Sequence, residues 1–104
     1  MSRQFDVHSN IFSADRAGPP YLINLQADHL SALRTIVVAP LWPASGPRPP
    51  APVSVAVTFD RQQYWLAMNE ITFVRLTSAG PVMGNIAGAR DRIIRALDLL
   101  FTGV

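Results

Sequence analysis

The sequence contains no cysteine and no lysine, and only 15% of its 104 residues are charged. Without cysteine there is no disulfide scaffold, no thiol nucleophile and no zinc or iron–sulfur site built on thiolates, which fits a reducing cytosol. No apolar run approaches the roughly 20 residues that cross a bilayer. The first ten residues also lack the basic-then-apolar order of a signal peptide. We therefore expect a cytoplasmic protein with no membrane association.

The charge balance gives little support for nucleic-acid binding. All nine basic residues are arginines, and they are scattered among seven acidic residues, which leaves a net charge of +2. Nucleic-acid binders usually gather their basic residues on one surface. Hydrophobic residues make up 49% of the chain, enough to bury a core. The length predicts a single domain over residues 1–104, with no direct, sequence-specific nucleic-acid contact.

Enzyme signatures are also scarce. The sequence has no glycine-rich phosphate loop, no HExxH and no GxSxG motif. Its two histidines, His8 and His29, lie beside polar residues that suit a strand end or a turn. A structural role for each outweighs a catalytic or metal-binding one. The acidic residues fall on different predicted elements, with no spacing that brings them together, so we predict no metal, no cofactor and no catalytic residue.

Most of the chain predicts short β-strands. Residues 53–59 alternate cleanly between apolar and small or polar side chains, whereas residues 35–42 form a continuous apolar run that is typical of a strand covered on both faces. The turn residues Asp60-Arg61-Gln62 and Met68-Asn69-Glu70 separate candidate strands. The predicted strands are 5–8, 21–27, 35–42, 53–59, 63–68 and 71–77. Their spacing favours antiparallel pairing.

Residues 43–52 hold five prolines in ten residues, which excludes a central strand. We interpret this segment as a stiff surface loop, and a proline-rich ligand for a partner's aromatic groove is the weaker alternative. After Gly80-Pro81 the period changes to about 3.6 and predicts a helix over residues 88–101. Its apolar stripe comprises Ile86, Ile93, Ile94, Leu97, Leu100 and Phe101, with Arg90 at its edge.

Two tryptophans and two methionines stand in apolar surroundings, and we predict that Trp42, Trp65, Met68 and Met83 pack in the core. The apolar ending over residues 99–104 directly follows the predicted helix. This ending suggests burial in a partner or in a second copy of the chain. The alternative is that it folds back onto its own sheet.

Several segments together resemble the CcdB family, the toxins of plasmid and chromosomal toxin–antitoxin pairs. The matching segments are RQFDV, PYLINLQADHL followed by IVVAPL, VSVAVTFDRQQYWLAMNEITFV and the ending DRIIRALDLLFTGV. The proline-rich loop is the divergent part. The most specific pieces are the LQ-D-L segment over 25–30, the turn and tryptophan over 60–65, and the helix that ends in Phe101-x-Gly103-Val104.

The resemblance implies a mainly β fold, an SH3-like small barrel of antiparallel strands with one C-terminal α-helix, and a symmetric homodimer. It also implies a bacterial, non-enzymatic toxin active in plasmid maintenance. Such a toxin binds the A subunit of DNA gyrase, a type II topoisomerase, and traps the cleaved gyrase–DNA complex. A partly disordered, CcdA-like antitoxin would remove it.

By position, the resemblance assigns the gyrase contacts to Ala27, His29, Leu30, Asp98, Thr102, Gly103 and Val104. Thr102 stands where the best-known family member has a tryptophan that packs against gyrase. Asp98 replaces an asparagine, and Ala27 and His29 replace a serine and an isoleucine. The loss of the aromatic anchor predicts weaker gyrase binding.

Two other functions remain open at this point. MazF-type toxins share the barrel and cut mRNA with an arginine and a hydroxyl residue on the sheet, and Arg34, Arg61 or Arg75 with a neighbouring threonine would be the candidates here. No motif of that family is present. The other alternative is a non-toxic homologue that retains antitoxin binding.

Overall fold

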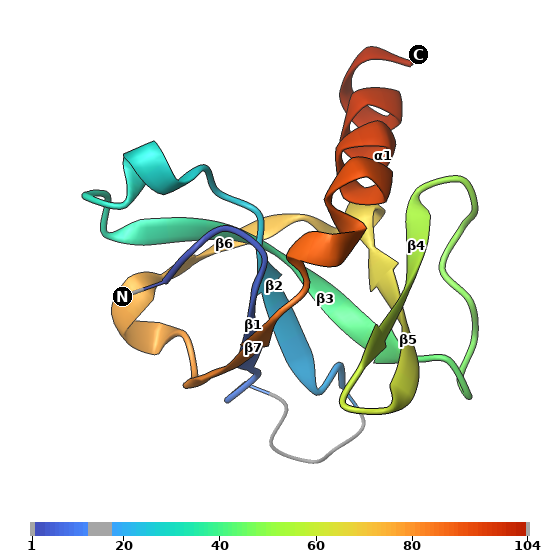
Figure 1. Cartoon of the computed structure of the whole chain (residues 1–104), viewed down its shortest axis with the longest axis horizontal. Helices are drawn as coiled ribbons and strands as arrows, with labels where there is room; N and C mark the ends of the chain where they lie inside the picture. Colours follow the sequence, from blue (N-terminus) through green and yellow to red (C-terminus); the bar gives the residue numbers. More distant parts are fainter. Residues whose placement is uncertain (1, 13–17, 104) are drawn as a thin grey trace.

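An antiparallel β-sheet curls into a half-barrel, and a C-terminal α-helix rises from it in the computed structural model (Figure 1). The structure describes residues 2–12 and 18–103. The strands are β1 (Asp6–Ser9), β2 (Tyr21–Asn24), β3 (Thr35–Pro43), β4 (Ser54–Phe59), β5 (Gln62–Ala67), β6 (Thr72–Arg75) and β7 (Val82–Asn85). The helix α1 spans Arg90–Thr102, and short 3-10 helices occupy η1 (Asp28–Leu30), η2 (Met68–Glu70), η3 (Leu76–Ser78) and η4 (Ala87–Ala89).

Strand β3 organises the sheet. The strand order is β4-β5-β3-β2-β1-β7, and β6 pairs with β3 as well. Residues 35–38 of β3 pair with β6, whereas residues 41–43 pair with β5, on the edge opposite β2. The long strand β3 therefore pairs with two shorter strands, β5 and β6, along the same edge, which allows the sheet to curl. The predicted fold class, a mainly β small barrel with one C-terminal helix, is confirmed.

The β4–β5 hairpin closes through a two-residue turn. Phe59 pairs with Gln62, and the two residues between them, Asp60 and Arg61, have φ angles of 51° and 65°. Positive φ at both central residues is the conformation that matches the twist of antiparallel strands. The predicted turn is therefore present, one residue shorter than expected because Gln62 belongs to β5.

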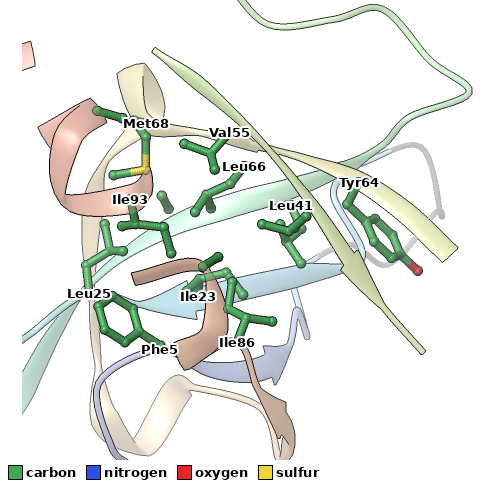
Figure 2. Packing of buried hydrophobic residues seen from close by; sticks show 14 of the residues in the cluster. Phe5, Ile23, Leu25, Leu41, Val55, Tyr64, Leu66, Met68, Ile86 and Ile93 are labelled. Atoms are coloured by element: carbon green, nitrogen blue, oxygen red, sulfur yellow. The ribbon is translucent and has the colours of Figure 1, made fainter. Parts of the chain in front are cut away.

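The main core lies between the sheet and the first turns of α1 (Figure 2). Ile93 of α1 is fully buried beside Leu25, Leu66 and Met68. A second, smaller cluster of Leu22, Ile36 and Val38 packs on the other face of the sheet, against Val74, Leu76 and Ala79. The middle of the sheet is consequently apolar on both faces, as the continuous run over 35–42 predicted for its central part.

Gly80 marks a close crossing of two backbone segments. A Cβ atom at this position would lie 2.1 Å from the carbonyl oxygen of Ser9. The Ser9 N–H also donates to the carbonyl oxygen of Pro81 over 3.0 Å. Only glycine fits here, so this residue fixes how β7 enters the sheet beside β1.

Three core predictions are wrong. Met68 is fully buried as expected, but Met83 is 53% exposed on β7, a strand that the sequence did not predict. Trp42 and Trp65 are only half-buried, because they lie on the outer face of the sheet. There the Trp42 indole N–H donates to Glu70 over 2.9 Å, and the Arg48 guanidinium lies 4.4 Å from the ring centre of Trp65.

Arg48 belongs to the proline-rich segment, whose Pro43 is the last residue of β3 and whose other residues lie in the connection from β3 to β4 (Figure 1). The same arginine donates to the hydroxyl of Ser54 over 3.3 Å. The loop therefore covers the tryptophan face of the hairpin. Stiff backbone holds the arginine over the ring.

The helix is close to its predicted bounds, but its apolar stripe is used differently along its length. Ile93 and Ala96 are buried in this chain's own core, and Ile94 and Leu97 pack against it. Phe101, by contrast, is 71% exposed. The first half of the stripe is therefore covered by this chain's own sheet and is not available to a partner. No helix in the described residues is long and apolar enough to cross a membrane.

Candidate functional site

The last turn of α1 carries the first group of predicted contact residues. Asp98, Thr102 and Gly103 are all exposed, at the end of the helix that points away from the sheet (Figure 1). The Thr102 hydroxyl donates back to the carbonyl oxygen of Asp98 over 2.6 Å. Gly103 adopts φ 77° and donates its N–H to Leu99, a left-handed C-cap that ends the helix. Val104 lies outside the described residues.

The second group lies on the loop between β2 and β3. Ala27 is half-buried at the start of η1, while His29 and Leu30 are exposed on it. The Gln4 N–H donates to the carboxylate of Asp28 over 2.8 Å, which ties η1 to the N-terminal segment. The loop is thus held in place and presents His29 and Leu30 to solvent.

Figure 1 shows η1 and the C-terminal end of α1 on different sides of the half-barrel. One chain therefore does not bring the described members of the two groups into a single patch. The family resemblance grouped these residues by their expected role in gyrase binding, not by their position in the fold. A target that touches both groups would have to span the molecule or contact two copies of it.

Arginines and hydroxyl groups gather at a different place, where the η1–β3 loop meets the end of β6. A cavity of about 730 Å³ is lined by Arg34, Thr35, Arg75 and Thr77, among others. Thr35 lies directly opposite Arg75 in the β3–β6 ladder. Guanidinium and hydroxyl groups in this arrangement suit a phosphate oxygen.

The comparisons with known proteins agree with this architecture. The family model described as CcdB protein matches residues 4–103. The chain belongs to the CcdB family. The sequence resemblance to toxins of toxin–antitoxin pairs is therefore confirmed. No curated protein matches the chain.

Among solved structures, this CcdB-family chain is similar to an endoribonuclease in complex with its cognate antitoxin from Mycobacterial species. The TM-score is 0.76 at 14% sequence identity, and the match covers 94% of this chain and 92% of that one. At so low an identity the likeness shows a shared fold.

The buried histidine of this CcdB-family chain has a structural role. His8 is only 3% exposed, and its Nδ1 lies 2.7 Å from the carbonyl oxygen of Gly80, which accepts a hydrogen bond. Nε2 is then the acceptor for the hydroxyl of Ser2, also at 2.7 Å, and that hydroxyl accepts from the Asn24 amide. Every polar atom of the ring is satisfied. Among the described residues, no group of three or more acidic or histidine side chains could hold a metal ion.

A tyrosine cluster at the β4–β5 hairpin was not predicted as a feature of interest. The rings of Tyr21 and Tyr64 meet edge to face at 5.7 Å, and Phe59 packs on Tyr21 at 5.3 Å. Burial raises the pKa of the Tyr64 phenol above 10.0, and the neighbouring Tyr21 and Asp60 raise it further. Phe59 and Tyr64 belong to one hairpin, but Tyr21 comes from β2, far earlier in the sequence, so no local pattern could have shown the whole cluster.

Proposed function

We propose that this CcdB-family chain is a cytoplasmic, non-enzymatic toxin that binds the A subunit of a type II topoisomerase. The observation that carries the proposal is the last turn of α1, which presents Asp98, Thr102 and Gly103 to solvent at the end of a projecting helix. A rigid helix end can enter a target without disturbing the toxin's own core, because the core residues lie in the first turns. A CcdA-like antitoxin would neutralise the toxin. The whole of residues 1–104 would act as one domain.

We also propose that the toxin works as a homodimer. Val37 and Phe73 face each other across the β3–β6 ladder, on the same face of β3 as the core residues Ala39 and Leu41. This face of the sheet therefore continues past the part that α1 covers and leaves both side chains exposed. A two-fold partner would cover this face with an identical one. It would also place two copies of η1 and α1 in one particle, which could unite the two groups of contact residues.

The test is induced expression in a gyrase-sensitive bacterial host and in a matched gyrase-resistant one. We expect growth arrest in the sensitive host only, together with trapped, cleaved DNA in a supercoiling reaction with purified gyrase. Arrest in both hosts would contradict gyrase as the target. If growth is arrested in neither host, the result would favour the other alternative, a non-toxic homologue that retains antitoxin binding.

The cavity of Arg34, Thr35, Arg75 and Thr77 favours one second candidate function. A MazF-like mRNA endoribonuclease needs an arginine and a hydroxyl group beside a phosphate, and the structural likeness is to an endoribonuclease. Arg34→Gln separates the two functions, because Arg34 lines the cavity but precedes β3 and lies outside the Val37–Phe73 pair. It would abolish arrest and mRNA cleavage in the endoribonuclease, but leave arrest intact in a topoisomerase poison. Arg90→Gln, exposed on α1 and outside the cavity, is the matched control.

A further inference from the structure

Strand β4 lies at one end of the sheet and has an unpaired edge. The Met68 N–H donates to the carbonyl oxygen of Val53, so in the β4–β5 ladder the backbone groups of Val55 and Val57 also face β5. The intervening Ser54, Ala56 and Thr58 therefore direct their N–H and C=O groups outward. In the described part of the chain, no backbone hydrogen bond from another element reaches the N–H groups of these three residues.

Strand β4 itself carries no device that prevents pairing with another chain, and the contact at its centre is the hydrogen bond from Arg92 of α1 to the Ala56 carbonyl oxygen. Natural edge strands carry proline, a bulge or charged side chains that keep other strands away. In β4 the edge-facing residues are serine, alanine and threonine, and the β4–β5 register runs without interruption from Ser54 to Phe59. Ala56, at the centre, is exposed and small enough for a backbone to approach.

The groove beside the edge is basic. A cavity of about 230 Å³ between β4 and α1 is lined by Ala56, Arg92, Arg95, Ala96 and Leu99, among others, and no acidic residue lines it. Arg92 donates to the carbonyl oxygen of Ala56, so the charged guanidinium has an uncharged hydrogen-bond acceptor at the unpaired edge. A carboxylate is a stronger partner for a guanidinium than a carbonyl is. The apolar floor suits an alternate side chain of an added strand.

The neighbouring cavity, of about 560 Å³, shares Ala56 and Arg92 and continues toward the hairpin turn, where Asp60 lines it. Arg92 and Arg95 thus line the groove near Ser54, and Asp60 lines it near the turn. Trp65 is already covered by Arg48, so its ring is not open to a nucleobase. These features favour a polypeptide over a nucleic acid.

We propose that the β4 edge binds an extended, acidic polypeptide segment, which joins the sheet as an additional strand and places its carboxylates against Arg92 and Arg95. The segment's backbone would pair with Ser54, Ala56 and Thr58, while one apolar side chain would fill the groove against Leu99. Binding would draw Arg92 from the Ala56 carbonyl to a ligand carboxylate. This inference does not depend on the proposed topoisomerase target, since no step uses it.

The probe is a capped eight-residue peptide of alternating glutamate and valine, added to the full-length, isotope-labelled protein. At saturation we expect amide hydrogen exchange at Ala56 and Thr58 to slow at least about tenfold. Arg92→Gln and Arg95→Gln should each weaken binding about 5- to 20-fold, and the matched Arg90→Gln should not change it. A lysine–valine peptide should bind at least about tenfold more weakly than the acidic one.

Ala56→Pro removes the central edge N–H and should abolish binding, because proline is tolerated on an edge strand but cannot donate. A thermal melt checks that the variant folds, and the arginine variants decide the matter if it does not. Four results would overturn the proposal. The first is no binding at millimolar peptide, and the second is binding without protection of the Ala56 and Thr58 amides. The third is protection of these amides already in the peptide-free protein, which would mean that a second copy occupies the edge. The fourth is equal binding of a decauridine RNA at the same amides.

Discussion

Replacing Phe73 by serine should strongly weaken the proposed homodimer. Phe73 is 67% exposed in the single chain, so a partner that covers it removes about two thirds of the side chain from water. Full burial of a phenylalanine is worth about 3 kcal/mol, which makes the contribution about 2 kcal/mol per copy. A two-fold interface contains the residue twice, so we expect a loss of about 4 kcal/mol, or roughly 700-fold in the dimer dissociation constant.

Sedimentation equilibrium over a wide concentration range measures this constant directly, because the chain mass is 11.4 kDa and the dimer has twice that mass. Phe12→Ser is the matched control, since Phe12 is 63% exposed and lies on the segment after β1, outside both β3 and β6. We expect this control to dimerise as the unmodified protein does. An unchanged dimer in Phe73→Ser, or a monomeric unmodified protein at high micromolar concentration, would refute the proposed interface.

Four further outcomes are expected. Thr102→Trp should strengthen gyrase binding in calorimetry by about 2–4 kcal/mol, roughly 30- to 1,000-fold, with an unchanged melting temperature, because the exposed helix end gains an aromatic anchor; unchanged affinity would contradict this role. Gly80→Ala should lower the free energy of unfolding in urea by about 2–4 kcal/mol, whereas Gly88→Ala, whose Cβ meets nothing within 4 Å, should stay within about 0.5 kcal/mol. Because burial raises the pKa of Tyr64 above 10.0, the free energy of unfolding should stay constant below pH 10 and fall as pH rises through the pKa of the folded state. Tyr64→Phe should remove the part of this fall that Tyr64 causes. An ultraviolet titration in which every tyrosine ionises near pH 10 would refute the raised pKa. A short CcdA-like polypeptide from the adjacent gene should be disordered alone, fold on this chain in circular dichroism and protect cells; failure to bind in calorimetry would count against the antitoxin partner.

The strands that alternate cleanly were predictable from local pattern. Residues 53–59 correspond to β4 within one residue, because Val55 and Val57 are buried while Ala56 and Thr58 are exposed. Strand β7 was not predictable, since its four residues include a glycine and its pairing depends on β1, far away in the sequence. Short strands with exposed side chains leave no periodic signal.

The positions of the tryptophans show a second limit. Trp42 and Trp65 have apolar neighbours in sequence, which favoured the core, yet they pair across β3 and β5 on the outer face. What covers Trp65 is Arg48, from a loop whose path depends on tertiary structure. Sequence alternation indicates which residues share a face, but not which face a loop will shield.

The contact residues could be predicted only through the family resemblance. Nothing in the spacing of Ala27 and Thr102 relates one to the other, and a single chain keeps their elements apart. The arginine and hydroxyl cavity was partly anticipated, because Arg34 and Arg75 were candidates beside threonines. That Thr35 would lie opposite Arg75 required the register of β6 on β3.

The position of α1 in the chain has a consequence for the order of events during translation. All strands of the described residues precede α1 in sequence, yet Ile93 and Ala96 complete the core that those strands form. A nascent chain of which only the strands have left the ribosome still lacks Ile93 and Ala96, so Leu66 and Met68 remain exposed to water or chaperones. Its native packing, and the helix end proposed to engage the target, are then acquired in the same step, when α1 is released. Ribosome-bound fragments that stop before residue 90 should accordingly be protease-sensitive and harmless to the cell that makes them.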